Sequence, residues 1–146
     1  MTDVSITFSP RDVRRFLKTA FGPLQKNHKR ALDAAAGKAL EIIETRTRDG
    51  YSINGARFKR YTKSYADYRV ANNLNPYPVD LSFSGAMLRS MHSTRTGKNE
   101  RILRFRGGDN NKKAAMNNKT RPFFGLNARD RKRVSDTYLT YLTRRP

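Results

Sequence analysis

The sequence predicts a single α+β domain over residues 1–146, in which a long helix packs on a small, mostly antiparallel sheet, with N-terminal and C-terminal helices. An apolar stripe with helical spacing begins at Leu24 and reaches Ile43. Two short segments with strand-like patterns flank a turn at residues 97–99. Helical stripes beside hairpin patterns are typical of α+β domains. At this length a domain buries enough surface to fold without a metal or disulfide, and the sequence has no cysteine.

The N-terminal segment predicts a strand and then a helix. Residues 4–8 alternate apolar and hydroxyl side chains, which is the period of a half-buried strand. Ser9 and Pro10 then favour a helix start, because serine caps the first turn and proline needs no N–H donor there. Gly22 ends this helix.

The longest predicted element is a second helix that Pro23 opens and that continues to Arg48. At 1.5 Å per residue it is about 37 Å long, enough to cross the domain. Alanines on this helix allow a sheet or another helix to approach closely. The predicted apolar stripe comprises Leu24, His28, Leu32, Ala35, Ala39, Ile42 and Ile43.

The middle of the chain alternates loops with short elements. We expect flexible loops near residues 49–60, 71–80 and 107–120, the last with at most one helical turn. Thr62 or Ser64 caps a short helix between the first two loops. Ser84 and Gly85 are predicted to shape a turn before another short helix that docks on the long one.

The last part of the chain predicts a hairpin, a strand and a helix. Residues 91–96 and 101–106 form the hairpin, with one buried and one basic face on the second strand. The apolar run 121–126 predicts a further strand. Asn127 as the N-cap and Asp130 three residues later predict the start of the C-terminal helix.

Positive charge dominates the composition. The chain has 31 lysines and arginines against 12 acids, a net charge of +19, and residues 101–146 carry 13 bases and 3 acids, or +10. This charge predicts a polyanion or an acidic protein surface as a partner, although a basic surface without a dedicated partner is the simpler alternative. The sequence has no apolar run long enough for a membrane span and no signal-peptide pattern, so we expect a soluble protein that is not secreted.

No catalytic or metal-binding motif stands out, so an enzyme is not expected, and no cofactor or metal is predicted. His28 and His92 lie in different elements and are expected to be structural. A metal-dependent nuclease would need clustered carboxylates, whereas the acids are scattered along the chain. Asp80 and Glu100 are the one pair that could converge for a hydrolase.

Basic residues in three segments are candidates for contact with nucleic acid. Residues 58–65 interleave bases with aromatic side chains. Basic residues also crowd the starts of the two longest predicted helices, where the helix dipole disfavours them unless an anion lies nearby. These candidates for DNA or acidic-partner contact are Lys26, Lys29, Arg30, Arg129, Arg131, Lys132 and Arg133.

Three short motifs stand in a recognisable order after the long helix. They are Thr62-Lys63-Ser64, then Leu81 with Ser84-Gly85-Ala86-Met87-Leu88-Arg89-Ser90, then Arg121-Pro122-Phe123-Phe124-Gly125-Leu126. In this order, over roughly residues 31–142, the chain resembles the phage virion-morphogenesis family, the small tail-completion and neck proteins of the Mu type, related in fold to tail terminators. It departs from the family pattern at Ala86 and Met87, and at residues 116–118, where the family has an aromatic-glycine pair.

The resemblance implies a non-enzymatic virion protein at the neck or head-tail connector of a tailed bacteriophage, present in the host cytoplasm during assembly. It implies a ring of six or twelve copies around the DNA channel, in contact with portal, adaptor or tail proteins. Tyr77, Phe123 and Phe124 are then candidate subunit-interface residues. The alternative is a free-standing, sequence-independent nucleic-acid-binding protein.

Overall fold

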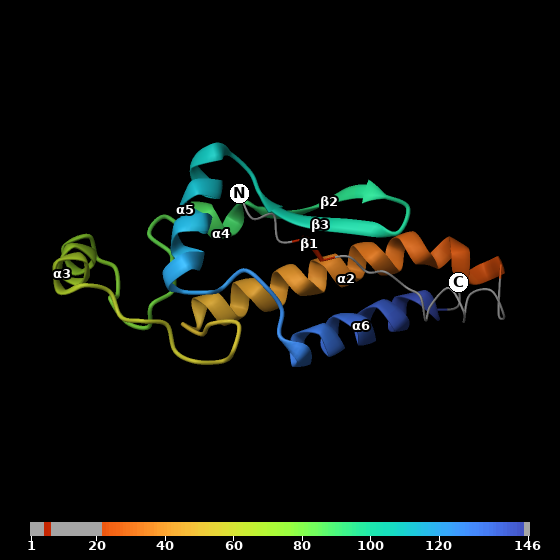
Figure 1. Ribbon diagram of the computed structural model, residues 1–146, viewed down its shortest axis with the longest axis horizontal. Coiled ribbons are helices and arrows are strands. Elements are labelled where there is room, and N and C mark those ends of the chain that lie inside the picture. The colour runs from red at the N-terminus through yellow and green to blue at the C-terminus, as the bar shows by residue number, and fades with distance from the viewer. Residues whose placement is uncertain (1–4, 7–21, 145–146) are drawn as a thin grey trace.

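The computed structural model describes residues 5–6 and 22–144, with side chains from residue 27 onward (Figure 1). Within these residues the chain forms five helices and a three-stranded sheet, which confirms the predicted α+β class. The predicted strand at 4–8 is described only as β1, Ser5–Ile6. The predicted helix from Ser9 to Phe21 lies outside the described residues.

The long helix α2, Gly22–Arg48, is the middle layer of the molecule. The sheet covers one side of it and helix α6, Ala128–Leu142, packs along the other (Figure 1). The predicted alanine-rich stripe makes this possible, because small side chains allow both neighbours to approach α2 closely. Fully buried side chains on α2 include Ala31, Leu32, Ala35, Ala39 and Ile43.

The sheet has the strand order β1-β3-β2 and is antiparallel throughout. Its predicted hairpin is confirmed as β2, Met91–Gly97, and β3, Glu100–Phe105. Leu103 and Phe105 are buried while Arg104 and Arg106 are exposed, as the alternation predicts. The same alternation turns Arg101 inward.

Arg101 is almost fully buried because an acid and backbone carbonyls surround its guanidinium. Its Nε donates to Asp33 Oδ1 at 2.6 Å, and its Nη1 donates to the Glu100 carbonyl at 2.8 Å. Arg95 donates to the other carboxylate oxygen of Asp33 at 2.6 Å. Asp33 therefore joins α2 to both strands of the hairpin, and a buried arginine becomes tolerable through these partners.

Helices α2 and α6 run antiparallel and are joined at both ends. Near the start of α2, Asn27 Nδ2 donates to the Leu142 carbonyl at 3.1 Å. Near its end, Arg46 pairs with Asp130 and donates to the carbonyls of Phe123 and Gly125. Asp130 also completes the predicted N-cap, since Asn127 accepts from its backbone N–H at 2.9 Å. Asp130 thus completes the capping box of α6 and neutralises Arg46, whose side chain is 11% exposed.

Residues 63–83, here called the arm, leave this layered body and return to it. The arm begins with α3, Lys63–Ala71, which confirms the predicted short helix and lies away from the sheet (Figure 1). Arg69 anchors it with a side chain that is only 1% exposed. Its guanidinium donates to the carbonyls of Asn75 and Ser82, at 3.0 and 2.7 Å, and to Asp80 at 3.2 Å.

Two predictions on the C-terminal side of the hairpin are wrong. The expected loop at 107–120 is the helix α5, Gly108–Thr120. The only buried side chain of α5 is Ala114, so the helix has no apolar stripe. The sequence therefore contains no periodic pattern that predicts it. The run 121–126, which follows α5, is not a strand. Its backbone N–H groups at Phe123 and Phe124 donate to Asn118 Oδ1 at 3.0 and 3.1 Å, and not to a neighbouring strand.

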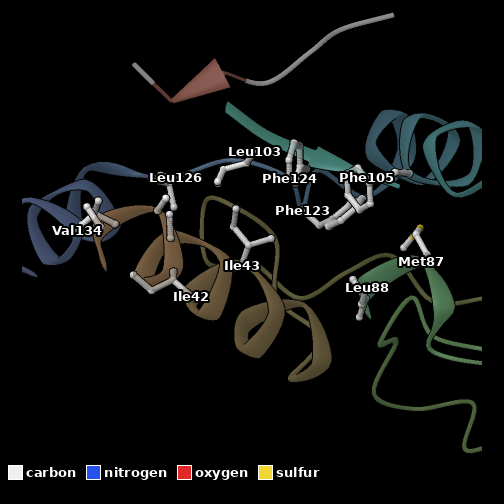
Figure 2. Close-up of a cluster of buried hydrophobic side chains, with 14 of the residues drawn as sticks. Ile42, Ile43, Met87, Leu88, Leu103, Phe105, Phe123, Phe124, Leu126 and Val134 are labelled. Atoms are coloured by element: carbon white, nitrogen blue, oxygen red, sulfur yellow. The ribbon is translucent and has the colours of Figure 1, made fainter. Parts of the chain in front are cut away.

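The phenylalanines of this run lie in the hydrophobic core. Phe105, Phe123 and Phe124 gather between β3 and α5, with Leu103 and Ile43 beside them (Figure 2). The ring centroids of Phe105 and Phe124 are 4.7 Å apart, and Phe123 is 0% exposed. The core therefore extends from the α2–α6 contact to the end of the sheet where α4, Ala86–Arg89, and α5 meet.

Candidate functional site

The two predicted basic helix starts lie at opposite ends of the molecule. Helices α2 and α6 are antiparallel, so the start of α6 lies beside the end of α2, where Arg46 meets Asp130. Lys29 is 17 residues before Arg46 on the same helix, which places the two groups about 25 Å apart. The predicted cations therefore form two separate surfaces. The side chain of Lys26 lies outside the described residues.

At the start of α6, the basic side chains point into solvent. Arg129, Arg131, Lys132 and Arg133 are all exposed. Lys132 donates to Asp136 at 2.9 Å on the next turn. No ion pair with a described acid holds the three arginines, so their charge is available to an anionic partner.

A second basic segment lies at the same end. The loop 49–60 is tied to the α6 start, because Asn127 Nδ2 donates to the Ile53 carbonyl at 2.7 Å. Ile53 N–H in turn donates to the Pro122 carbonyl at 2.9 Å. The start of α6 and the loop 49–60, which includes residues 58–60 of the predicted nucleic-acid segment 58–65, thus meet through Ile53 near the end of α2 (Figure 1). We call this surface the basic end; its exposed bases are Arg48, Arg57, Lys59, Arg60, Arg129, Arg131, Lys132 and Arg133.

Aromatic rings hold part of the basic end in place. The Arg57 guanidinium lies over the Tyr51 ring, 4.0 Å from its centroid, and Arg57 donates to the Asp49 carbonyl. Arg60 lies 5.3 Å from the Tyr77 ring centroid. Cation–π contacts restrict these side chains without removing their charge. The predicted interface residue Tyr77 is 53% exposed, so it remains accessible to a neighbour.

Phe123 and Phe124 do not form an exposed interface, contrary to the sequence prediction. Both are buried in the core, so neither can contact a neighbouring subunit without unfolding this region. The sequence predicts an apolar run here, but such a run packs equally well inside its own domain or against a partner. The predicted turn residues are correct, since Gly85 has a φ of +76°, which disfavours any side chain, and Ser84 Oγ accepts from the Ala86 N–H.

The three ordered sequence motifs converge on one pocket. It has a volume of about 440 Å³ and opens between α3, α4 and α5. The first motif contributes Thr62. The second contributes Leu81 and residues 84–87, and the third contributes Arg121. Segments spread over about sixty residues thus line one pocket. The other lining residues are Tyr61, Tyr65, Phe83, Lys113 and Asn117.

Arg121 organises the pocket from the α5 side. Its Nε and Nη2 donate to the carbonyls of Lys59 and Arg60 at 2.7 and 3.0 Å. The same guanidinium lies 5.1 Å from the Tyr61 ring centroid. Burial raises the pKa of Tyr61, although the nearby Arg69 charge opposes that rise. The Tyr61 phenol therefore stays neutral, and the positive charge at this wall comes from arginine.

The remaining polar candidates are structural. His28 Nδ1 and Tyr138 Oη lie 2.8 Å apart, and His28 Nε2 lies 2.8 Å from Asn99 Oδ1, so the ring joins α2, α6 and the hairpin turn. Burial raises the pKa of Tyr138 to about 12. Asp80 binds Arg69 and the Ser82 N–H. Among the described residues no cluster of three or more histidines and acids could hold a metal ion.

Several residues that line the pocket or lie beside it carried no individual signal in the sequence. Tyr65, Tyr68 and Phe83 are exposed, whereas aromatic residues at such spacing are most often core residues. Lys113 belongs to the helix that the sequence did not predict. The pattern that could have indicated the site is the interleaving of aromatic and basic residues at 58–65.

Comparison with known proteins gives no relative for this chain. No family model, curated protein or solved structure matches it. Of the helices in the described part of the chain, none has the length and apolar character that a membrane span requires.

Proposed function

We propose that this chain is a structural, non-enzymatic virion protein of a tailed bacteriophage, a ring component of the neck or head-tail connector that surrounds the DNA channel. The basic end carries the proposal. It gathers unpaired arginines from α6 and bases from the loop 49–60 on one surface, where they suit the phosphate backbone of double-stranded DNA. The ordered motifs that resemble the phage virion-morphogenesis family supply the virion context.

The geometry favours binding that does not depend on DNA sequence. The exposed groups are guanidinium and ammonium ions on a helix start and a loop, which suit phosphates. In the described residues no helix pair forms a helix-turn-helix reader of base edges, and cysteines for a zinc finger are absent from the sequence. A channel lining needs this kind of contact, because DNA of any sequence passes through it.

The same surface supports the alternative, a free-standing nucleic-acid-binding protein. The two functions differ in their assembly. A channel component acts as a closed ring in which each copy adds a basic end, and its neighbours are portal, adaptor or tail proteins. A free-standing binder needs no ring. The site therefore supports DNA contact in both cases, and the oligomeric state separates them.

A matched pair of variants tests which end of the molecule meets DNA. We would measure duplex DNA binding over a range of salt concentrations for Arg129→Gln with Arg133→Gln, and for Lys29→Gln with Arg30→Gln. Each variant removes two exposed charges from the start of a long helix. We expect the α6 pair to weaken binding and to reduce the slope of log K against log salt by about 2. The α2 pair should leave the slope nearly unchanged.

An equal loss of DNA affinity in both variants would contradict the proposal, because binding would then depend on the net charge of the protein and not on the basic end. Circular dichroism and thermal unfolding of both variants provide the control for folding. In a phage assembly assay, failure of the α6 pair with retention of its fold would agree with a channel role.

A further inference from the structure

Exposed apolar side chains gather around the arm. Of seven large apolar or aromatic residues in the described chain that are more than a third exposed, six lie on the arm or on α5. Where exposed apolar side chains form a contiguous patch, they mark interaction sites on soluble domains. The six residues are Tyr65, Tyr68, Val70, Tyr77, Phe83 and Met116, whereas Leu139 lies alone on α6.

Three of these aromatic residues form a connected row with Tyr61 beside the pocket. Tyr61 and Tyr65 meet edge to face, with centroids 4.9 Å apart. Tyr65 and Tyr68 follow at 6.2 Å, and Tyr68 stacks on Phe83 at 5.7 Å with an angle of 11° between the rings. These contacts fix the rings against one another, so the surface is preorganised and a partner would not have to order it.

The pocket beneath this row has an apolar floor and a basic rim. Leu81 and Met87 are buried at its base, and Tyr65 and Phe83 form part of its wall. Lys113 and Arg121 also line it, and no acidic residue does. A large apolar side chain suits the floor, and flanking carboxylates suit the rim.

The nearby acids do not neutralise this rim. Asp67 accepts from Lys63 on α3, and Asp80 accepts from the buried Arg69. The Arg121 guanidinium donates to backbone carbonyls only, so its charge has no acidic partner among the described residues. The electrostatic preference of the pocket is therefore for a negatively charged segment.

Two other occupants fit less well. A second copy that presented the same surface would place this basic rim against itself. A nucleic acid base would need an exposed ring face, and the stacking of Tyr68 on Phe83 already occupies one face of each of these rings. An acidic peptide segment avoids both difficulties, because its apolar side chain can enter the pocket while its carboxylates contact the basic rim.

We propose that this pocket binds an acidic segment of a partner protein, with one large apolar or aromatic side chain seated on Leu81 and Met87 and carboxylates facing Lys113 and Arg121. The arm is then the partner-binding surface, and the basic end, which adjoins the pocket where Arg121 bonds the carbonyls of Lys59 and Arg60, is the surface for DNA. This proposal does not depend on the ring or on DNA binding, because the pocket residues are not those of the basic end.

The test uses the full chain and a random peptide library displayed on a carrier. Selection for binding should enrich peptides in which one aromatic or leucine residue is flanked by aspartates or glutamates. A synthetic enriched peptide is then measured by fluorescence anisotropy, beside versions in which alanine replaces the apolar residue or asparagine replaces the acids. Both replacements should weaken binding about tenfold or more.

Two matched pairs of variants locate the binding. Lys113→Glu should weaken peptide binding about tenfold, while Lys112→Glu, with the same change of charge on the neighbouring exposed residue, should change it much less. Phe83→Ala should weaken it similarly, while Leu139→Ala on α6 should not. DNA binding should be unaffected by Phe83→Ala.

Four outcomes would overturn the proposal. One is the absence of any enriched peptide with a dissociation constant below about 1 mM. Another is enrichment of basic or purely polar peptides. The third is an equal loss of peptide affinity in the pocket variants and in their matched controls. Tight binding of a single-stranded oligonucleotide that Phe83→Ala abolishes would assign the pocket to nucleic acid instead.

Discussion

The body and the arm use the same residue types for opposite purposes. In the body, Phe105, Phe123 and Phe124 lie in the core between β3 and α5. In the arm and its return, Tyr65, Tyr68 and Phe83 pack on one another and remain exposed. In the body the aromatic side chains therefore contribute to the stability of the core, whereas those of the arm remain exposed, as the proposed partner-binding role requires.

Buried arginines show a second contrast. Arg101 in the body shares Asp33 with Arg95 and thereby fixes the hairpin on α2. Arg69 in the arm binds acceptors that all come from residues 75–82. Its bonds therefore hold the arm in shape, while those of Arg101 hold separate layers together. We expect a substitution at Arg69 to destabilise only the arm, and a substitution in the core of the body to destabilise the whole fold.

The largest effect is expected from Phe123→Ala. This side chain is fully buried, so its removal leaves a cavity and should lower the free energy of unfolding by about 4 kcal/mol. Urea denaturation followed by circular dichroism measures the change. Phe124→Leu provides a milder control in the same cluster. A loss below about 1 kcal/mol would mean that Phe123 does not lie in the core.

A smaller and local effect is expected from Arg69→Met. The substitution leaves Asp80 and the carbonyls of Asn75 and Ser82 without their buried donor, at a cost of about 2 to 3 kcal/mol. Hydrogen exchange should accelerate in residues 63–83 and remain slow in α2 and α6. Acceleration throughout the molecule would remove the distinction between arm and body.

Asp33→Asn should destabilise the body by about 1 kcal/mol, because Asp33 is 39% exposed and solvent screens its ion pairs. Burial alone would raise the pKa of Asp33, but the hydrogen bonds and charges of Arg95 and Arg101 outweigh it and hold the pKa below its ordinary value of 3.8. The ionised carboxylate therefore stabilises the fold at neutral pH, and this contribution disappears as the pH falls through the lowered pKa.

Unfolding measured from pH 7 down to the acid range checks this prediction. The stability difference between the natural chain and Asp33→Asn should be greatest above the ordinary carboxyl pKa and should shrink below it. A difference that grows as the pH falls would contradict the assignment of the ionised form.

The smallest effect on stability is expected from Phe83→Ala. Because the side chain is 44% exposed and stacks only on the surface, its loss should change the free energy of unfolding by no more than about 0.5 kcal/mol. Thermal unfolding beside Phe123→Ala measures the contrast directly. A loss similar to that of Phe123→Ala would show that the arm uses its aromatic residues for folding.

The sequence predicted elements whose signals are local. The α2 stripe, the hairpin turn and the Asn127–Asp130 cap each depend on spacing within a few residues, and all three are confirmed. Helix α5 was missed because its only buried side chain is Ala114 and its stabilising contacts are tertiary. The run 121–126 has strand-like composition, but Asn118 takes the N–H groups that a neighbouring strand would need.

The candidate site was predictable in its charges but not in its grouping. Exposed bases at Arg129 and Arg131 follow from composition and helix position, whereas their meeting with the loop 49–60 depends on Asn127 and Ile53. Which phenylalanines are buried also depends on packing across the chain. The sequence therefore placed Phe123 and Phe124 at an interface, although Phe83 is the exposed one.

The proposed function makes the oligomeric state the most direct test. We would measure the particle mass of the purified chain by light scattering across protein and salt concentrations, with and without duplex DNA. We expect a closed oligomer of defined mass, with six or twelve copies as the family resemblance implies. Duplex DNA should bind to this oligomer without dissociating it. A protein that stays monomeric at every concentration while it binds duplex DNA tightly in physiological salt would contradict the connector function and favour a free-standing nucleic-acid-binding protein.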